Sequence, residues 1–126
     1  MTGDLIFQKW YTERAMAQSY VRLLLRGVVE PLLLFIIGEL LPIHGYEIAR
    51  ELERRSEGYF DLTASTLYSA LRRLERRGLV SSSWQYIAKQ KRRCYQLTEK
   101  GRQILAEELA QWEQFLGATD RVIDSQ

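Results

Sequence analysis

The stretch TASTLYSALRRLERRGLV, residues 63–80, decides how this chain folds. Thr63 is of a type favoured as a helix N-cap, and Gly78 is of a type favoured just past a helix end. Between them the apolar residues recur at the spacing of one helix face: Leu67, Ala70, Leu71 and Leu74. The pattern predicts a helix over about 64–77 that buries this stripe and exposes hydroxyl, tyrosine and arginine side chains.

The period of the sequence changes directly after this helix. Residues 79–87 and 93–97 are rich in Val, Trp, Tyr, Ile and Leu, which favour strands. Between them lies the basic segment AKQKR, residues 88–92. We expect two antiparallel strands joined by a charged, flexible loop.

Two further helices are expected ahead of the helix over about 64–77. The stretch from Pro31 to Leu41 is apolar nearly all round, so it should be the most buried helix, and Pro42 ends it. A tight turn at His44–Gly45 then leads into an amphipathic helix over residues 46–56.

The N-terminal extension is a separate amphipathic helix in this interpretation. Residues 4–26 carry apolar side chains at helical spacing. Gly27 weakens a helix and Pro31 removes a backbone hydrogen bond inside one, so we place a break or kink between them.

A long helix is predicted after Thr98, which is a good N-cap. It carries a heptad-like apolar series: Leu105, Leu109, Trp112 and Leu116. Too little chain remains to cover this face. We therefore expect these residues to form the interface of a homodimer.

The order helix, helix, helix, strand, strand, helix predicts a mainly α, α+β winged-helix fold. Residues 1–27 form the N-terminal extension helix, and residues 28–98 form a three-helix helix-turn-helix core with a two-stranded β wing. Residues 99–126 form the long C-terminal dimerisation helix. Together these three parts predict a single DNA-binding domain with a helical appendage at each end.

Charge is segregated along the chain, although the net charge is only +2. Residues 63–97 hold eight basic side chains and the single acid Glu75, whereas the remaining residues hold ten basic and fifteen acidic side chains. A basic block of this kind indicates a surface that faces a polyanion. A solvated arginine face is the alternative that charge alone leaves open.

We assign the exposed face of the third helix and the basic loop to double-stranded DNA. Hydroxyl, Tyr and Arg side chains on the helix can contact phosphates or base edges, and the loop is expected to supply phosphate contacts. The predicted DNA-binding residues are Thr63, Ser65, Thr66, Tyr68, Ser69, Arg72, Arg73, Lys89, Lys91 and Arg92.

Several function classes are excluded by residue counts. With one cysteine, Cys94, and one histidine, His44, the chain lacks the residues for an internal disulfide, a zinc site or a catalytic triad. No nucleophile paired with a base and no phosphate loop is present, so we predict no enzyme and no cofactor. We interpret His44 as a turn residue, and Cys94 as either a buried core residue or a thiolate stabilised by neighbouring arginines.

The longest apolar stretch, residues 28–43, is interrupted by charged residues and prolines, so no membrane span is predicted. The first residues also lack the charged-then-apolar order of a secretory signal. A cytoplasmic location is the expectation.

Three segments together resemble the PadR family of transcriptional regulators. They are LPIHGYEIARELE at 41–53, TASTLYSALRRLERRGLV at 63–80 and KRRCYQLTEKGR at 91–102, within a likeness that covers about 28–116. The resemblance implies a winged-helix dimer whose C-terminal helix supplies much of the interface. It further implies a repressor that binds a two-fold related operator.

The chain departs from the family pattern at Ala64 and Ser69, where members often have Pro. Residues 1–27 resemble the extended first helix of some members, including a cyanobacterial clock regulator, which would make a clock gene the target. Trp112 matches a position at which a drug-binding branch stacks a planar aromatic effector, and a dimer-interface anchor is the alternative. The competing function is a protein-interaction module that uses the amphipathic terminal helices, and a gel-shift titration would separate the two.

Overall fold

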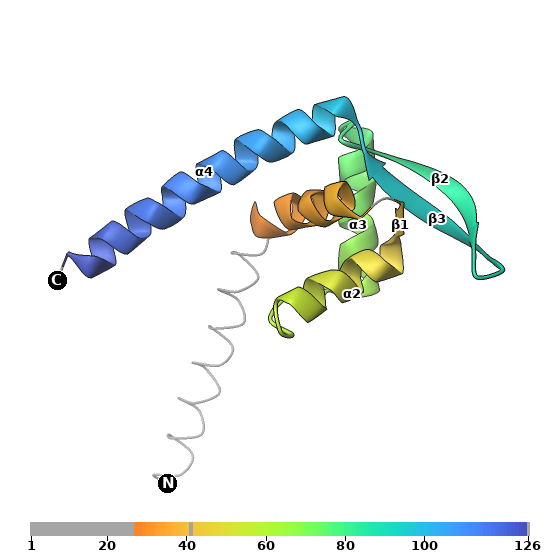
Figure 1. Cartoon of the computed structure of the whole chain (residues 1–126), viewed down its shortest axis with the longest axis horizontal. Helices are drawn as coiled ribbons and strands as arrows, with labels where there is room; N and C mark the ends of the chain where they lie inside the picture. Colours follow the sequence, from red (N-terminus) through yellow and green to blue (C-terminus); the bar gives the residue numbers. More distant parts are fainter. Residues whose placement is uncertain (1–26, 41, 126) are drawn as a thin grey trace, which may run out of the picture.

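The computed structural model describes residues 27–40 and 42–125, and it has the winged-helix architecture predicted from the sequence (Figure 1). Residues 27–39 form the first described helix. The following elements are β1 (Ile43–His44), α2 (Gly45–Arg55), α3 (Ala64–Arg76), β2 (Val80–Ile87), β3 (Gln90–Leu97) and α4 (Glu99–Asp124). The predicted helix over 4–26 lies outside the described residues.

The hydrophobic core lies where the helix of residues 27–39, α2 and α3 pack against the small sheet (Figure 1). Burial follows the helical and strand periods of the sequence, because each element turns one apolar face inward. The most deeply buried side chains are Leu33, Leu34, Ile37, Ile43, Ile48, Leu71, Leu74, Leu79 and Val80.

Helix α3 is bounded by the capping residues that the sequence predicts. The Thr63 hydroxyl oxygen accepts a hydrogen bond from the Thr66 backbone N–H at 3.1 Å, which satisfies one of the unpaired donors of the first turn. Gly78 follows the helix with φ +74°, a conformation that glycine adopts without a Cβ clash. The helix prediction over about 64–77 is confirmed to within one residue.

The predicted break between Gly27 and Pro31 is wrong, because residues 27–39 are continuously helical. Pro31 lacks only the N–H that would pair with the Gly27 carbonyl. The burial of Leu33 and Leu34 one turn later offsets this loss, since both side chains are fully buried. The helix ends at residue 39 rather than 41.

The wing is a regular hairpin, which corrects the prediction of a long basic loop. Strand β3 begins at Gln90, and only Ala88 and Lys89 form the turn, with φ 51° and 66°. Two positive φ values in a two-residue connection match the twist of paired strands. Lys91 and Arg92, which the sequence assigned to the loop, therefore lie in β3 and are held by pairing with β2.

A short third strand was missed by the sequence analysis. Ile43 and His44 form β1, which pairs with β3 opposite Tyr95 and Cys94, so the sheet order is β1-β3-β2. His44 is therefore a buried strand residue rather than a turn residue, and its Nε2 lies 3.2 Å from Glu47 Oε1. Two residues are too few to show an alternating pattern, so no strand was predicted here.

Cys94 is buried in the sheet, which agrees with the core interpretation rather than the thiolate. Burial raises the pKa of its thiol, and the nearby Glu47 carboxylate raises it further. Both effects disfavour a reactive thiolate.

Hydrogen bonds hold the start of α4 against the end of α3. Thr98 caps α4 by accepting from the Gly101 N–H at 3.0 Å, and its hydroxyl donates to the Gly78 carbonyl at 2.6 Å. Gly101 lies so close to the Leu79 carbonyl that a Cβ there would be 2.0 Å from that oxygen. The backbone of α4 can approach only because residue 101 has no side chain.

Candidate nucleic-acid interface

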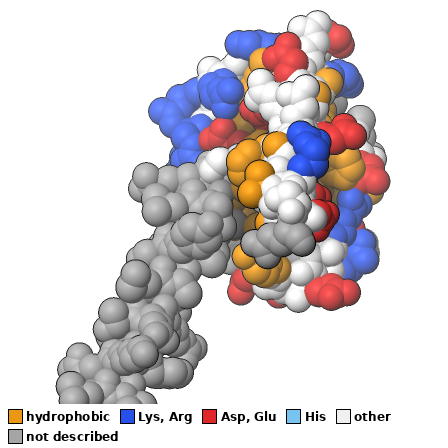
Figure 2. All heavy atoms as spheres, turned by 90° about the vertical axis from the view of Figure 1, so that its left-hand side faces the viewer, with side chains coloured by type: hydrophobic (Ala, Val, Ile, Leu, Met, Phe, Trp, Pro, Cys, Tyr) orange, Lys and Arg blue, Asp and Glu red, His pale blue; other side chains and the backbone are white. Residues whose placement is uncertain are grey.

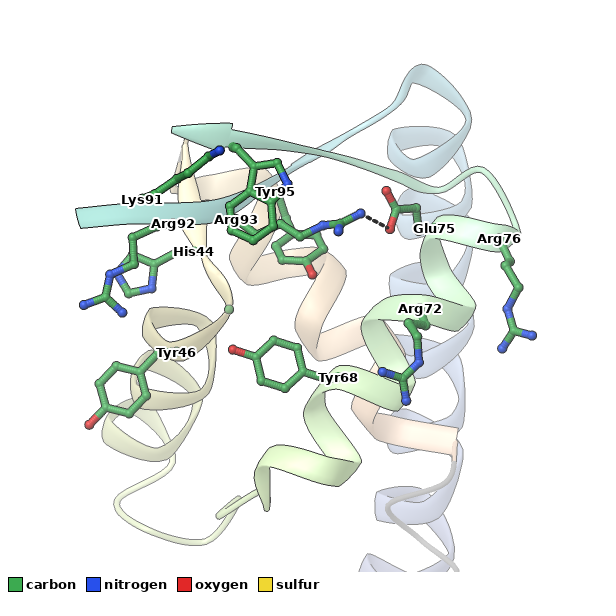
Figure 3. Close-up of a pocket in the computed structure, with 12 residues that line it drawn as sticks. His44, Tyr46, Tyr68, Arg72, Glu75, Arg76, Lys91, Arg92, Arg93 and Tyr95 are labelled. Carbon is green, nitrogen blue, oxygen red and sulfur yellow. Dashed lines mark ion pairs between the residues drawn. The ribbon is translucent and has the colours of Figure 1, made fainter. Parts of the chain in front are cut away.

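A cleft of about 850 Å³ lies between α3 and the wing. Figure 3 shows side chains from α2, α3 and the hairpin converging on this space. Its lining is aromatic and basic with one acid: His44, Gly45, Tyr46, Tyr68, Arg72, Glu75, Arg76, Trp84, Lys91, Arg92, Arg93 and Tyr95. Such a concave cationic surface suits a polyanion.

Helix α3 contributes Tyr68, Arg72 and Arg76 to the cleft, which are four residues apart and so share one face. Tyr68 is 41% exposed, and its ring packs over Gly45, where a Cβ would come within 3.0 Å of the ring. Glycine at position 45 thus lets Tyr68 lie flat against the start of α2. Arg72 donates to Ser69 Oγ at 3.3 Å, which holds the guanidinium along the helix.

Arg73 of this helix and Arg77 at its C-cap point elsewhere. Arg73 Nε donates to Glu30 at 2.9 Å and Arg77 Nη1 donates to the same carboxylate at 2.8 Å. Glu30 belongs to the helix of residues 27–39, so these pairs fasten α3 to the body. Within the described residues, neither Arg72 nor Arg76 has an acidic partner. The arginine-rich helix therefore has a structural face and an available face.

The wall of the cleft opposite α3 is the hairpin. Lys91 and Arg93 share the face of β3 that is turned toward α3, because side chains two residues apart in a strand point to the same side. Arg93 lies 3.5 Å from the Glu75 carboxylate, the ion pair drawn in Figure 3. Ser82 also donates to Glu75 at 2.5 Å. The acid of the cleft is thus neutralised and ties the wing to α3.

The predicted DNA-binding residues fall into two groups. Tyr68, Arg72, Lys91 and Arg92 line the cleft. Thr63, Ser65 and Thr66 are exposed at the start of α3, with the Thr63 hydroxyl already engaged by Thr66. Lys89 occupies the turn at the wing tip, Ser69 accepts from Arg72, and Arg73 faces Glu30.

Eight cleft residues were not among the predicted sites, and they include two aromatic and two basic side chains: Tyr46, Trp84, Arg76 and Arg93. Arg76 could have been found from its spacing of four residues from Arg72. Trp84 and Arg93 required the strand register, which pairs them directly. The sequence analysis placed residues 88–92 in a loop, so the pairing of Trp84 with Arg93 was not predicted.

The predicted dimerisation residues are not equivalent. Leu105 packs against the core beside Gly38, and Leu109 borders the same groove. Trp112 lies beside Gly27, Glu30 and Pro31. Leu116 is exposed, as are its neighbours Phe115, Val122 and Ile123.

None of the helices described within residues 27–125 is long and apolar enough to cross a membrane. Over the same described positions, no three His, Cys, Asp or Glu side chains gather where they could hold a metal ion.

Residues 33–107 match the family model of the PadR-like transcriptional regulators. The chain belongs to this PadR-like family. An uncharacterized protein of Lysinibacillus sphaericus is 29% identical over 90 residues, which span 71% of this chain and 82% of that protein.

Solved structures of PadR-like regulators share the architecture. A PadR family regulator from Eggerthella lenta is 28% identical with a TM-score of 0.76, covering 92% of this chain and 99% of that one. A transcriptional regulator from Clostridium thermocellum is 27% identical with a TM-score of 0.68, covering 81% of this chain and 95% of that one. The PadR-like chain described here is accordingly a DNA-binding transcription regulator and not an enzyme.

Proposed function

We propose that this PadR-like protein is a homodimeric repressor that binds a two-fold related operator through the cleft between α3 and the wing. Tyr68 and Arg72 on α3 contact base edges and nearby phosphates, while Lys91 and Arg92 contact the backbone. The observation that carries the proposal is the convergence of unpaired Arg72 and Arg76 with Lys91 in one cleft, within the part of the chain that the structure describes.

The division of the α3 arginines supports this assignment. Arg72 and Arg76 face the cleft, whereas Arg73 is held by Glu30. A guanidinium already paired with a carboxylate must lose that partner before it can bind DNA, and an unpaired one need not. The proposed interface therefore includes Arg76 and leaves Arg73 out.

The homodimer is proposed because apolar side chains are exposed in the distal part of α4, residues 106–124. Leu109 and Leu116 lie seven residues apart on that helix, as in a coiled-coil seam. Two-fold symmetry of such a dimer would place two copies of α3 for two half-sites of an operator.

Trp112 is assigned to anchoring α4 rather than to an aromatic effector. It lines a cavity of about 280 Å³ together with Glu30 and Pro31 of the helix of residues 27–39. The finer suggestion of a clock gene as target depends on residues 1–27, nearly all of which lie outside the described residues.

The experiment selects bound duplexes from a random library and then measures affinity by gel shift. Arg72→Ala should weaken binding to the selected duplex by roughly 1–3 kcal/mol and relax preference at one base position. Arg76→Ala should weaken binding with less change in preference. Arg50→Ala, on α2, is the charge-matched control.

If Arg72→Ala and Arg50→Ala weaken binding equally, the cleft is not the DNA site. If the wild-type protein selects no duplex at all, the repressor proposal fails. The alternative, an interaction module that uses its terminal helices, would then be favoured.

A further inference from the structure

The wing exposes two large aromatic side chains that its fold does not require. Trp84 is 59% exposed and Tyr86 is 79% exposed, both on β2. Residues two apart on a strand share a face, and Trp84 lines the cleft, so Tyr86 continues the cleft-facing side toward the wing tip. Exposed aromatic rings at one place on a soluble domain mark a contact surface more often than isolated ones do.

The strand register sets this aromatic pair beside a pair of cations. Trp84 lies opposite Arg93, and Tyr86 lies opposite Lys91. The hairpin face therefore has an aromatic column on β2 and a basic column on β3. Alternating aromatic and cationic groups of this kind match a nucleic-acid strand, in which apolar sugars and bases alternate with phosphates.

Trp84 also organises the two cations. Lys91 Nζ lies 5.5 Å from the centre of a Trp84 ring, and Arg93 Cζ lies 5.8 Å from it, both within cation–π range. The indole thus attracts both long side chains toward the cleft. Trp84 lines the same cleft as Tyr68 and Arg72 of α3.

We propose that Trp84 and Tyr86 form a non-ionic DNA-contact surface on the wing. Their rings pack against the apolar faces of deoxyriboses and base edges of the duplex held in the cleft, and Lys91 binds an adjoining phosphate, while Arg93 stays paired with Glu75. The inference rests on the proposed function, because it takes duplex DNA as the occupant of the cleft. It changes the role of the wing from a purely electrostatic arm to one with an apolar contribution.

The two kinds of contact differ in their response to salt. Each phosphate contact contributes about 0.9 to the slope of log affinity against log salt concentration, because it releases counterions. An aromatic contact releases none. Loss of an aromatic ring should therefore lower affinity equally at every salt concentration, whereas loss of a lysine should flatten the slope.

The test is a salt series of gel shifts on a mixed-sequence duplex, with Tyr86→Ala and Lys91→Gln compared with the wild type. Tyr86→Ala should weaken binding about tenfold with an unchanged slope, which is the order expected when a large apolar side chain loses its burial. Lys91→Gln should reduce the slope by about 0.9. Tyr59→Ala is the matched control, because Tyr59 is 64% exposed but lies in the loop after α2, outside the cleft.

A second readout follows Trp84 directly. The wild-type protein should lose tryptophan fluorescence when the duplex is added, and Trp84→Phe should lose this change while binding nearly as well, because phenylalanine retains an aromatic face. The proposal is overturned if Tyr86→Ala and Tyr59→Ala bind alike, or if Trp84→Phe shows the same fluorescence change as the wild type. Absence of any wild-type binding would instead remove the proposed function on which it rests.

Discussion

Most aliphatic side chains of the body, residues 27–105, are buried, whereas the distal part of α4, residues 106–124, leaves several apolar side chains in water. In the body, Leu33, Ile37 and Ile48 have no exposed surface. In distal α4, Phe115 is 69% exposed and Val122 is 72% exposed. Figure 1 shows the reason, because α4 leaves the hairpin and extends beyond the packed helices.

The difference teaches that the body covers most of its aliphatic side chains itself, whereas distal α4 leaves Leu116, Val122 and Ile123 exposed. Figure 2 faces the end of the molecule toward which α4 runs, and hydrophobic side chains are exposed near its centre. Burying one large apolar side chain is worth about 1.5–3 kcal/mol, so several such side chains left in water favour association. The body should then tolerate loss of the distal apolar residues, and the assembly should not.

The largest expected effect tests this division directly. Phe115→Ser with Leu116→Ser removes two large side chains per protomer, or four per dimer. The dimer should weaken by at least several kcal/mol and become monomeric at micromolar concentration. Light scattering measures the mass, and circular dichroism should show that the body remains folded. A dimer that persists in the double variant would place the interface elsewhere.

The next effect concerns the start of α4, at its junction with the end of α3. Gly101→Ala puts a Cβ against the Leu79 carbonyl, a backbone atom that cannot rotate away. Overpacking of this kind costs about 1–3 kcal/mol or more, so the thermal midpoint should fall. Gly117→Ala in distal α4 is the control, since its Cβ would meet only the Arg121 side-chain nitrogen at 3.4 Å. Equal midpoints for the two variants would show that α4 does not press on Leu79.

A smaller effect is expected at the cap of the same junction. Thr98→Ala removes the hydrogen bond to the Gly101 N–H and the one to the Gly78 carbonyl. Loss of such a cap costs roughly 1 kcal/mol in stability. Thr119→Ala in distal α4 removes only a bond to the Phe115 carbonyl within the helix and should cost little. Chemical denaturation of both variants compares the two costs, and a larger loss for Thr119→Ala would contradict the comparison.

The sequence predicted most of the body because its helices combine a clear period with local caps. Thr63, Gly78 and Thr98 each act within a few residues of their own position, so their roles can be inferred without a tertiary structure. Helix α3, with Tyr68 and Arg72 on its cleft-facing side, was predicted in this way. The break placed at Pro31 failed because burial outweighed one lost hydrogen bond.

What the sequence did not predict depends on pairing between distant segments. Strand β1 exists only because Ile43 meets Tyr95, and β3 extends to Gln90 because it pairs with β2. Basic residues have low strand propensity, so the outer half of β3 read as loop. The two faces of α3 were likewise hidden, because only the fold brings Glu30 to Arg73.

The smallest effect concerns Glu108, which lies where α4 passes from the body to its distal part. Burial raises the pKa of this carboxyl, the Arg77 charge partly opposes the rise, and the Glu30 and Glu107 charges add to it. Its Oε2 has no hydrogen-bond partner within the described structure. A raised carboxyl pKa means that the folded state disfavours the charged form. Its stabilising contribution is present below the ordinary carboxyl pKa and is lost as pH rises through the raised value.

Glu108→Gln should therefore stabilise the protein at pH 7 by less than about 1 kcal/mol, because solvent screens a half-buried carboxylate. The gain should disappear below about pH 4, where the wild-type carboxyl is protonated in both states. Thermal melts across this pH range, with the exposed Glu113→Gln as control, measure the difference. A gain that is constant with pH would show that the carboxyl charge is not its cause.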